Sequence, residues 1–356
     1  MPSKAGIVRS GRHVSNVPAG DIAFRTPRPT APARSIFRNP SSAACRRQHT
    51  SYDSKPLRLL RLPTIIGANS LSRSKVVIMP GTSSWQLRDG EQIIACNGRL
   101  LGKRHFLIGI TRVRNEALIL RDTLDYVGKH VDAIVAYDDA STDRTPEILG
   151  GHPKVALIVT NRSWEADIDA RRIAEGRHRG LLLQTARQHL QFDWMFCFDA
   201  DERVTGDLRG YMERTHSSDC DGVRVQLFDA YMTPGDHAPY QADCELLGFR
   251  RFFGPERRDI LMLWRNRLEV IFAEHHGREP GGLERVETGL YCQHYGKSLS
   301  VEHWEETCDY YIRHFPFDTY GRKWTDRKGR AIHTQSDFMR PLYEWGDILF
   351  ANAVKM

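Results

Sequence analysis

Apolar and polar positions follow a regular order from Phe106 to Phe198, with short apolar runs separated by stretches of helical spacing. Short apolar runs bounded by polar residues are typical of buried strands, and recurrence every three or four residues is typical of helices. The expected strands are 106–110, 131–137, 155–159 and 194–198, and the expected helices are 115–130, 145–149 and 168–190. This alternation predicts an α/β fold with a doubly wound, mostly parallel sheet flanked by helices.

The pattern becomes mixed beyond residue 221. We expect a strand at 223–228 and helical regions at 301–314 and 328–349. The chain therefore divides into four parts. These are a disordered tail at 1–78, a lead-in segment at 79–105, the main α/β domain at 106–300, and a helical C-terminal extension at 301–356.

The predicted tail is rich in Ser, Pro and Arg and has no sustained apolar period, which predicts disorder. It also carries the basic charge, because fourteen Lys and Arg but only two acids lie up to Lys75, against 37 basic and 42 acidic residues in the remainder. We therefore expect no specific nucleic-acid partner. Three origins fit the tail: a transit peptide, a basic segment that contacts anionic membranes, or an over-extended reading frame that truly starts at Met79. The third is preferred.

Cysteine usage and hydropathy indicate the compartment. The chain has seven cysteines, an odd number, with wide spacing and no CxxC pair. This pattern argues against a disulfide framework or a structural zinc site. No apolar run reaches the ~18 residues of a membrane-spanning helix. We expect a cytoplasmic protein, with peripheral membrane contact as the alternative.

Two acidic clusters follow predicted strands: Asp138 and Asp139 in YDDASTDRT, and Asp199, Asp201 and Glu202 in FDADER. Ligands of open α/β sheets bind at the carboxyl ends of the strands. Carboxylates gathered there repel one another, and Mg²⁺ or Mn²⁺ relieves the repulsion while bridging to substrate phosphates. The simpler interpretation is helix capping, at the segment 205–212 and at the helix that begins at Thr145. Two clusters on one sheet edge favour the metal site.

Three motifs resemble family 2 glycosyltransferases, which have the GT-A fold. They are RNEA at 114–117, DDASTDRT at 138–145 and DADE at 199–202, in matching order and rough spacing across 106–300. Ala140 stands where the family more often has Gly. QHYGKS at 293–298 resembles the His-containing motif of related bacterial members. The resemblance implies metal-assisted transfer of a sugar from a nucleotide-diphosphate sugar to a hydroxyl of a glycan, a lipid-linked compound or another acceptor.

The resemblance also implies residue roles. The residues expected to bind the donor are Arg112, Arg114, Asn115, Glu116, Asp138, Asp139, Arg179, Asp199 and Lys297, where Arg179 is preferred to Arg177 and Arg172. The residues expected to hold Mn²⁺ or Mg²⁺ are Asp199, Asp201 and His294. Inverting transfer also needs a base for the acceptor hydroxyl. Asp243, Glu245 and Glu274 are the candidates, because they follow the DADE strand.

Three alternatives stay open. A haloacid-type phosphatase also places DxD after a buried strand, but it usually has Thr or Val where this chain has Arg203. A sugar nucleotidyltransferase needs a Gly-rich phosphate loop after the first strand, and TRVR at 111–114 is not one. A non-catalytic protein with the same fold would bind its ligands without turning them over.

Overall fold

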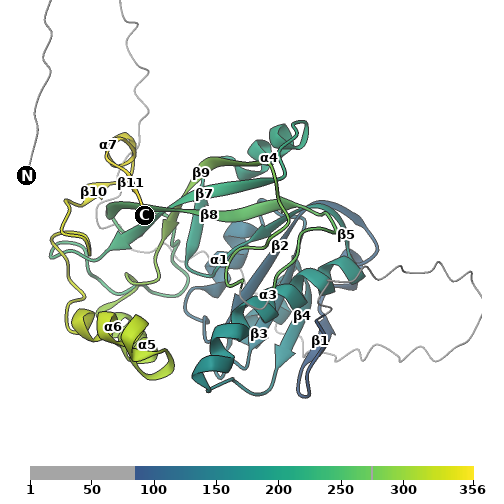
Figure 1. Cartoon of the computed structure of the whole chain (residues 1–356), viewed down its shortest axis with the longest axis horizontal. Helices are drawn as coiled ribbons and strands as arrows, with labels where there is room; N and C mark the ends of the chain where they lie inside the picture. The colour runs from purple at the N-terminus through teal and green to yellow at the C-terminus, as the bar shows by residue number, and fades with distance from the viewer. Residues whose placement is uncertain (1–84, 274–275) are drawn as a thin grey trace, which may run out of the picture. The chain divides into compact units, whose positions relative to one another are not determined.

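The computed structural model describes residues 85–273 and 276–356 (Figure 1). The predicted tail at 1–78 and the base candidate Glu274 lie outside the described residues. A four-stranded parallel core forms the centre of the sheet. Its strands, in spatial order, are β4 (Val155–Asn161), β3 (Ala133–Asp139), β2 (Arg104–Val113) and β5 (Gln191–Cys197). The predicted α/β class is confirmed, and the carboxyl ends of all four strands lie at one edge.

The parallel core is buried on both faces, because alternate side chains enter different hydrophobic clusters. Leu107 and Ile134 point to one cluster, whereas the next residues, Ile108 and Val135, point to the other. Two helices, α1 (Leu120–Val127) and α2 (Thr145–Gly151), cover the first face, and α3 (Ile168–His189) covers the second (Figure 1). This burial explains the nearly continuous apolar runs of these strands.

The second half of the sheet is mostly antiparallel. Outward from β5 follow β8 (Phe252–Arg265), β7 (Gly222–Tyr231), β9 (Val286–His294) and β6 (Glu202–Thr205), of which only β7 and β9 are parallel neighbours. The strands β10 (Tyr343–Glu344) and β11 (Val354–Lys355) pair with β8, and β1 (Gln92–Ala95) pairs with β4. The result is a mixed sheet of eleven strands within the described residues.

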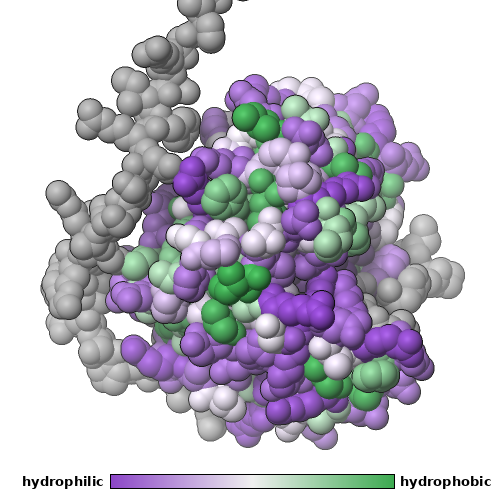
Figure 2. Space-filling view, turned by 90° about the vertical axis from the view of Figure 1, so that its left-hand side faces the viewer, coloured by the Kyte–Doolittle hydropathy of each residue, from purple (hydrophilic) through white to green (hydrophobic). Residues whose placement is uncertain are grey.

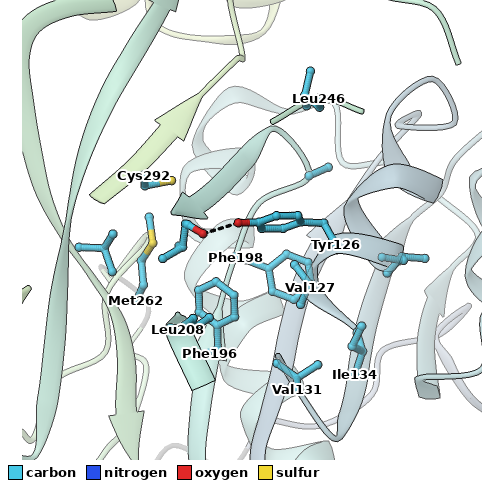
Figure 3. Close-up of a cluster of buried hydrophobic side chains, with 14 of the residues drawn as sticks. Tyr126, Val127, Val131, Ile134, Phe196, Phe198, Leu208, Leu246, Met262 and Cys292 are labelled. Carbon is cyan, nitrogen blue, oxygen red and sulfur yellow. Dashed lines mark hydrogen bonds between the residues drawn. The ribbon is translucent and has the colours of Figure 1, made fainter. Parts of the chain in front are cut away.

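A packed layer between α1 and the second half of the sheet supports the segment after β5 (Figure 3). Tyr126 of α1 donates its hydroxyl hydrogen to the backbone carbonyl of Val204 in β6. Thr123 donates to the carbonyl of Ala200 at 2.6 Å, and Phe198 packs beside them. These contacts from α1 fix the backbone of residues 199–202, which form the DADE motif.

The helices agree with the sequence pattern in part. The helix α5 (Val301–His314) spans the predicted region, and α6 (Arg322–Arg327) follows after the short turns of η2 (Phe317–Gly321). The helix predicted at 328–349 is wrong, since only α7 (Asp347–Ala351) forms there. Its apolar spacing is interrupted by Gly329, Met339 and Gly346, all at positive φ. The helix predicted at 115–130 begins at Leu120, five residues later than expected. A 3-10 turn, η1 (Gly98–Leu100), precedes β2.

Hydropathy of the described surface is mixed. On the face in Figure 2, apolar residues form small islands among hydrophilic ones. No helix within 85–273 or 276–356 is long and apolar enough to cross a bilayer.

Candidate functional site

A cavity of about 1210 Å³ opens at the carboxyl ends of β2 and β5. Its wall is formed by the segment after β2, the first half of α3, residues 199–201 after β5, and one face of α5. Charged side chains of both signs line it, including Arg112, Glu116, Arg179, Asp199 and Asp201. The structure therefore brings together one set of predicted residues from three segments distant in sequence.

Asp138 and Asp139, at the end of β3, lie behind this wall, and the described cavity lining contains neither of them. Asp139 is fully buried between Arg112 at 2.7 Å and Arg171 at 2.9 Å. Burial opposes ionisation of Asp139, but the two guanidinium groups outweigh it and lower the pKa. Asp139 thus orients Arg112 and Arg171. The part of Arg112 that does not contact Asp139 faces the cavity.

Asp138 has a different environment. It is 3% exposed, and burial raises the pKa of its carboxyl although Ser141 donates hydrogen bonds to it. Its Oδ1 atom has no hydrogen-bond partner among the described residues. A buried carboxylate oxygen without a donor is costly. Of the pair, Asp138 is therefore the one whose carboxylate keeps an unfilled acceptor position.

The segment after β2 is locked to the DDASTDRT loop. Arg114 donates to the backbone carbonyls of Asp139 and Ala140, both at 2.7 Å, and its guanidinium lies 4.7 Å from the Trp164 ring centroid. Asn115 accepts from the amide of Thr142 at 2.7 Å. Ala140 adopts a φ of 54°, which glycine adopts at lower cost and which explains the Gly preference of the similar motif.

Glu116 lines the cavity near the DADE motif. Burial raises the pKa of its carboxyl to about 8, and the charges of Asp201 and Asp199 add to the effect. Near neutral pH the carboxyl of Glu116 is therefore largely protonated. A protonated carboxyl can donate a hydrogen bond to a ligand oxygen as well as accept one.

Two arginines hold Asp199 of the DADE motif. Arg179 of α3 contacts its carboxylate at 3.0 Å, and Arg278 forms a second ion pair with it. Arg278 also contacts Glu202 at 2.6 Å. The preferred arginine thus reaches the motif, whereas Arg177 pairs with Glu91 at 2.6 Å. The simpler interpretation as a helix cap does not apply to this motif.

The cap of α4 (Leu208–His216) is Asp207, whose side chain accepts from the amide of Gly210 at 2.8 Å. Asp199 and Asp201 are therefore not needed for helix capping. This leaves their carboxylates for other partners.

Asp201 pairs with His294, and the distance between Oδ2 and Nε2 is 3.1 Å. The other ring nitrogen, Nδ1, lies 2.7 Å from Asp229 in β7. Burial disfavours the imidazolium, but the two carboxylates outweigh it and raise the pKa of His294 to about 10. Burial also opposes ionisation of Asp201, yet His294 lowers its pKa to about 2.

Asp201 and His294 suit a divalent ion whose remaining coordination positions are filled by a bound ligand. No group of three or more His, Cys, Asp or Glu gathers as a metal site within the described parts of the chain. Asp201 and His294 are nevertheless spaced like neighbouring ligands of one ion, which lie ~3 Å apart at bond lengths of about 2.1 Å. Asp229 supplies the carboxylate that typically orients a ligating imidazole. Asp199, held by two arginines, fits a ligand role less well.

Gly296 makes room for this pair. A Cβ atom there would lie 2.4 Å from Oδ2 of Asp201 and 3.0 Å from Nε2 of His294. The first distance is shorter than real contacts of a Cβ atom, and the second is tighter than most of them. The positions of these two side chains therefore depend on the absence of a side chain at residue 296.

Lys297 does not line the larger cavity. Its ammonium donates to the hydroxyl of Tyr231 at 3.0 Å, and it contacts Asp337 at 2.7 Å and Asp229 at 3.1 Å. An ammonium has three hydrogens, so these partners use them all. Its observed place is behind Asp229, outside the lining of the larger cavity.

The two described base candidates lie elsewhere. Asp243 and Glu245 are exposed in the loop between β7 and β8, and neither is among the described residues that line the cavity. The same loop packs toward α1, where the amide of Leu246 donates to Asp122 at 3.2 Å. The two acids lie away from the cavity because the loop that carries them runs toward α1 after β7 ends.

Several cavity residues were not foreseen from the sequence. On α5 they are His303, Glu306, Thr307 and Tyr310, and on α3 there is Arg171. The spacing of the α5 residues, three or four apart, places them on one helix face. That periodic polar stripe was the available signal. His303 is the one with a basic ring nitrogen, and burial lowers its pKa even though Asp201 opposes the shift.

Comparisons with known proteins give partial similarities. No family model matches the chain. Two uncharacterised mycobacterial proteins, from Mycobacterium bovis and Mycobacterium tuberculosis, are each 35% identical over 112 residues, or 31% of this chain. The match spans 27% of the length of those relatives.

Three solved structures match parts of this chain at low TM-scores. Staphylococcus aureus TarS 1–349 in complex with UDP is 12% identical over 62% of this chain and 68% of its own, with a TM-score of 0.32. HddC from Yersinia pseudotuberculosis is 10% identical over 57% and 98%, with a TM-score of 0.33. Mycobacterium tuberculosis glucosyl-3-phosphoglycerate synthase, in complex with Mn²⁺, UDP and glucosyl-3-phosphoglycerate, is 14% identical over 35% and 44%, with a TM-score of 0.25. These scores assign no substrate or residue role to this chain.

Proposed function

We propose that this protein is a glycosyltransferase that moves a sugar from a nucleotide-diphosphate sugar to an acceptor hydroxyl. One observation carries the proposal. Asp201 and His294 lie 3.1 Å apart beside a cavity of about 1210 Å³ at the carboxyl ends of parallel strands. That place in an α/β sheet is where nucleotides typically bind. The RNEA, DDASTDRT and DADE motifs support the same conclusion by resemblance.

The donor would occupy the larger cavity. Arg112, Arg171 and Arg179 all line it, and each is oriented by a carboxylate contact, to Asp139 or to Asp199. Guanidinium groups held in this way are suited to phosphate oxygens. Their charge would stabilise the diphosphate as it gains charge on leaving.

A divalent cation, Mn²⁺ or Mg²⁺, would be held by Asp201 and His294 and would add Lewis-acid stabilisation of the leaving diphosphate. Its binding requires His294 to give up the proton that its raised pKa favours. Asp229 would then keep the Nδ1 hydrogen of His294 and leave Nε2 to face the ion. Asp199 would keep Arg179 and Arg278 in place.

His303 is the group best placed to act as a base in an inverting transfer. It lines the cavity beside Asp201, burial lowers the pKa of its imidazole, and Nδ1 has no hydrogen-bond partner among the described residues. The acceptor oxygen would bond to the anomeric carbon while its proton passes to His303. The bond from that carbon to the diphosphate oxygen would break, and its electron pair would leave with the diphosphate.

The proposal is tested by thermal shift with a panel of nucleotide-sugars, with and without Mn²⁺, followed by a transfer assay on the donors that bind. Stabilisation by one nucleotide-sugar that requires Mn²⁺ is expected. Asp201→Asn should lose it, while Asp219→Asn, a substitution of a side chain that is 90% exposed, should not. Nucleotide binding without any turnover would favour the non-catalytic alternative. Absence of binding by every nucleotide-sugar contradicts the proposal.

A further inference from the structure

Arg112 of β2 lines the larger cavity, and two side chains hold its guanidinium. Its Nη2 atom contacts Asp139 at 2.7 Å, and its Nε atom donates a hydrogen bond to Nδ1 of His178 at 3.0 Å. Nε and Nη2 form one edge of the planar guanidinium, so these contacts leave both Nη1 hydrogens and one Nη2 hydrogen for other acceptors. A single contact to Asp139 would let the guanidinium rotate about it, and the contact to His178 therefore fixes its plane.

His178 is itself held rigidly. It lies on α3 and is 3% exposed. Its ring stacks on that of Tyr137, with the ring centroids 3.9 Å apart and an angle of 16° between the planes. Tyr137 is fully buried in β3 and lies opposite Arg112 in the register of β2 and β3. Its hydroxyl donates to Glu91 at 2.6 Å. The direction of Nδ1 of His178 is thus set by packing before any ligand binds.

The same contact defines the state of the imidazole. A guanidinium can only donate hydrogen bonds, so Nδ1 of His178 carries the accepting lone pair and the ring hydrogen is on Nε2. Burial and the charge of Arg112 lower the pKa of His178 to about 2, although the charge of Asp139 opposes the shift. His178 therefore stays neutral near pH 7 and accepts from Arg112 throughout that range.

His178 does not reach the ligand space. It is absent from the described lining of the larger cavity, whereas Arg112 is part of it. Any effect of His178 on a bound ligand must therefore pass through Arg112.

We propose that His178 is a positioning residue of the donor site, and that it fixes Arg112 so that the Nη1–Nη2 edge binds the donor diphosphate through two hydrogen bonds. Bidentate contacts of this kind depend on the orientation of the guanidinium plane. An edge that is oriented in advance loses less freedom when the ligand binds. The inference rests on the proposed transferase function for the identity of the ligand.

The test compares two substitutions of His178 with opposite properties. His178→Phe keeps a ring on Tyr137 but removes the acceptor. His178→Asn loses the ring but keeps an acceptor oxygen at the place of Nδ1, because both atoms are bonded to Cγ. Binding of UDP, GDP and inorganic pyrophosphate, each with Mn²⁺, is measured by titration calorimetry. His178→Phe should weaken the probes that bind the wild type roughly 10-fold, and His178→Asn should stay within about 3-fold of it.

Two further measurements separate positioning from a purely structural role. In an Arg112→Ala background, His178→Phe should cause no further loss of affinity, because the two residues act through one contact. His105→Phe is the matched control. His105 is a buried histidine on the same strand, but it contacts the carbonyl of Leu100 at 2.8 Å and is absent from the described lining of the cavity. Melting temperatures are recorded for all variants, and His178→Leu replaces His178→Phe if the latter does not fold.

Unchanged affinity in His178→Phe, an equal loss in His178→Asn, or an undiminished loss in the Arg112→Ala background overturns the inference. If the variants bind in the expected order but no nucleotide-sugar is turned over, the transferase proposal falls alone. If sugar transfer occurs and His178→Phe binds the diphosphates as the wild type does, only the role of His178 falls. A wild-type protein that binds none of the three probes contradicts both.

Discussion

Gly296→Ala should separate Asp201 from His294 without removing either residue. The added Cβ would lie 2.4 Å from Oδ2 of Asp201, so the carboxylate must retreat by about 1 Å to reach an ordinary contact. A retreat of that size lengthens the 3.1 Å contact to His294 to about 4 Å and breaks the hydrogen bond. The glycine has no positive φ, so the substitution causes no backbone strain.

The expected magnitude follows from this displacement. Losing the paired geometry of two metal-binding side chains should weaken Mn²⁺ binding by roughly 10- to 100-fold, the size typical of disturbed metal-site geometry. Overpacking should also cost the fold about 1–3 kcal/mol in free energy of unfolding. The variant should therefore remain folded and lose metal-dependent stabilisation by nucleoside diphosphate.

The assay is titration of Mn²⁺ in the presence of nucleoside diphosphate, with the melting temperature of the apo protein as the measure of folding. Gly151→Ala is the matched control, because no heavy atom lies within 4 Å of its Cβ position at the end of α2. The control should bind Mn²⁺ as the wild type does. Unchanged Mn²⁺ affinity in Gly296→Ala would refute the idea that this pair holds the ion.

Three further outcomes are expected. Asp201→Asn should abolish transfer while the protein stays folded, and full wild-type activity in EDTA would contradict a metal role. In EDTA, folding stability should fall as pH rises from about 6.5 to about 10, because the pKa of His294 is raised to about 10 and the folded state loses a favoured proton. His294→Gln should flatten this loss in urea unfolding at pH 6.5 and 9.5. Deletion of residues 1–78 should leave donor hydrolysis unchanged, since that segment lacks core-forming periodicity; an inactive truncated protein would show that the boundary is wrong.

The parallel half of the fold could be predicted because its strands are buried on both faces and read as apolar runs. The other half could not. The long strand β8 carries the charged sequence ERRD at 256–259 in its middle, and β9 has adjacent polar residues near both ends, ET at 287–288 and QH at 293–294, so neither shows an alternating pattern. The strands β6, β10 and β11 have two to four residues, too few for a period to emerge. Pairing with neighbours, and not local pattern, makes these segments strands.

The site shows the same division. The DADE and QHYGKS motifs correctly brought Asp201 and His294 to attention together, because a motif carries its own spacing. Asp229 escaped notice since its importance arises from register alone: β7 runs parallel to β9, and Asp229 lies opposite His294. Side-chain partners that are set by the pairing register of two strands cannot be predicted from the local sequence.

The two aspartates of the DADE motif have separate partners, although they lie within one turn. Asp199 neutralises Arg179 and Arg278, while Asp201 is paired with His294. If both carboxylates faced one ion, the two guanidinium groups would be left near a divalent cation and repelled by it. In the proposed transferase, Asp199 would hold the two guanidinium groups while Asp201 is left for the ion, so that both the arginines and the cation could act on the leaving diphosphate.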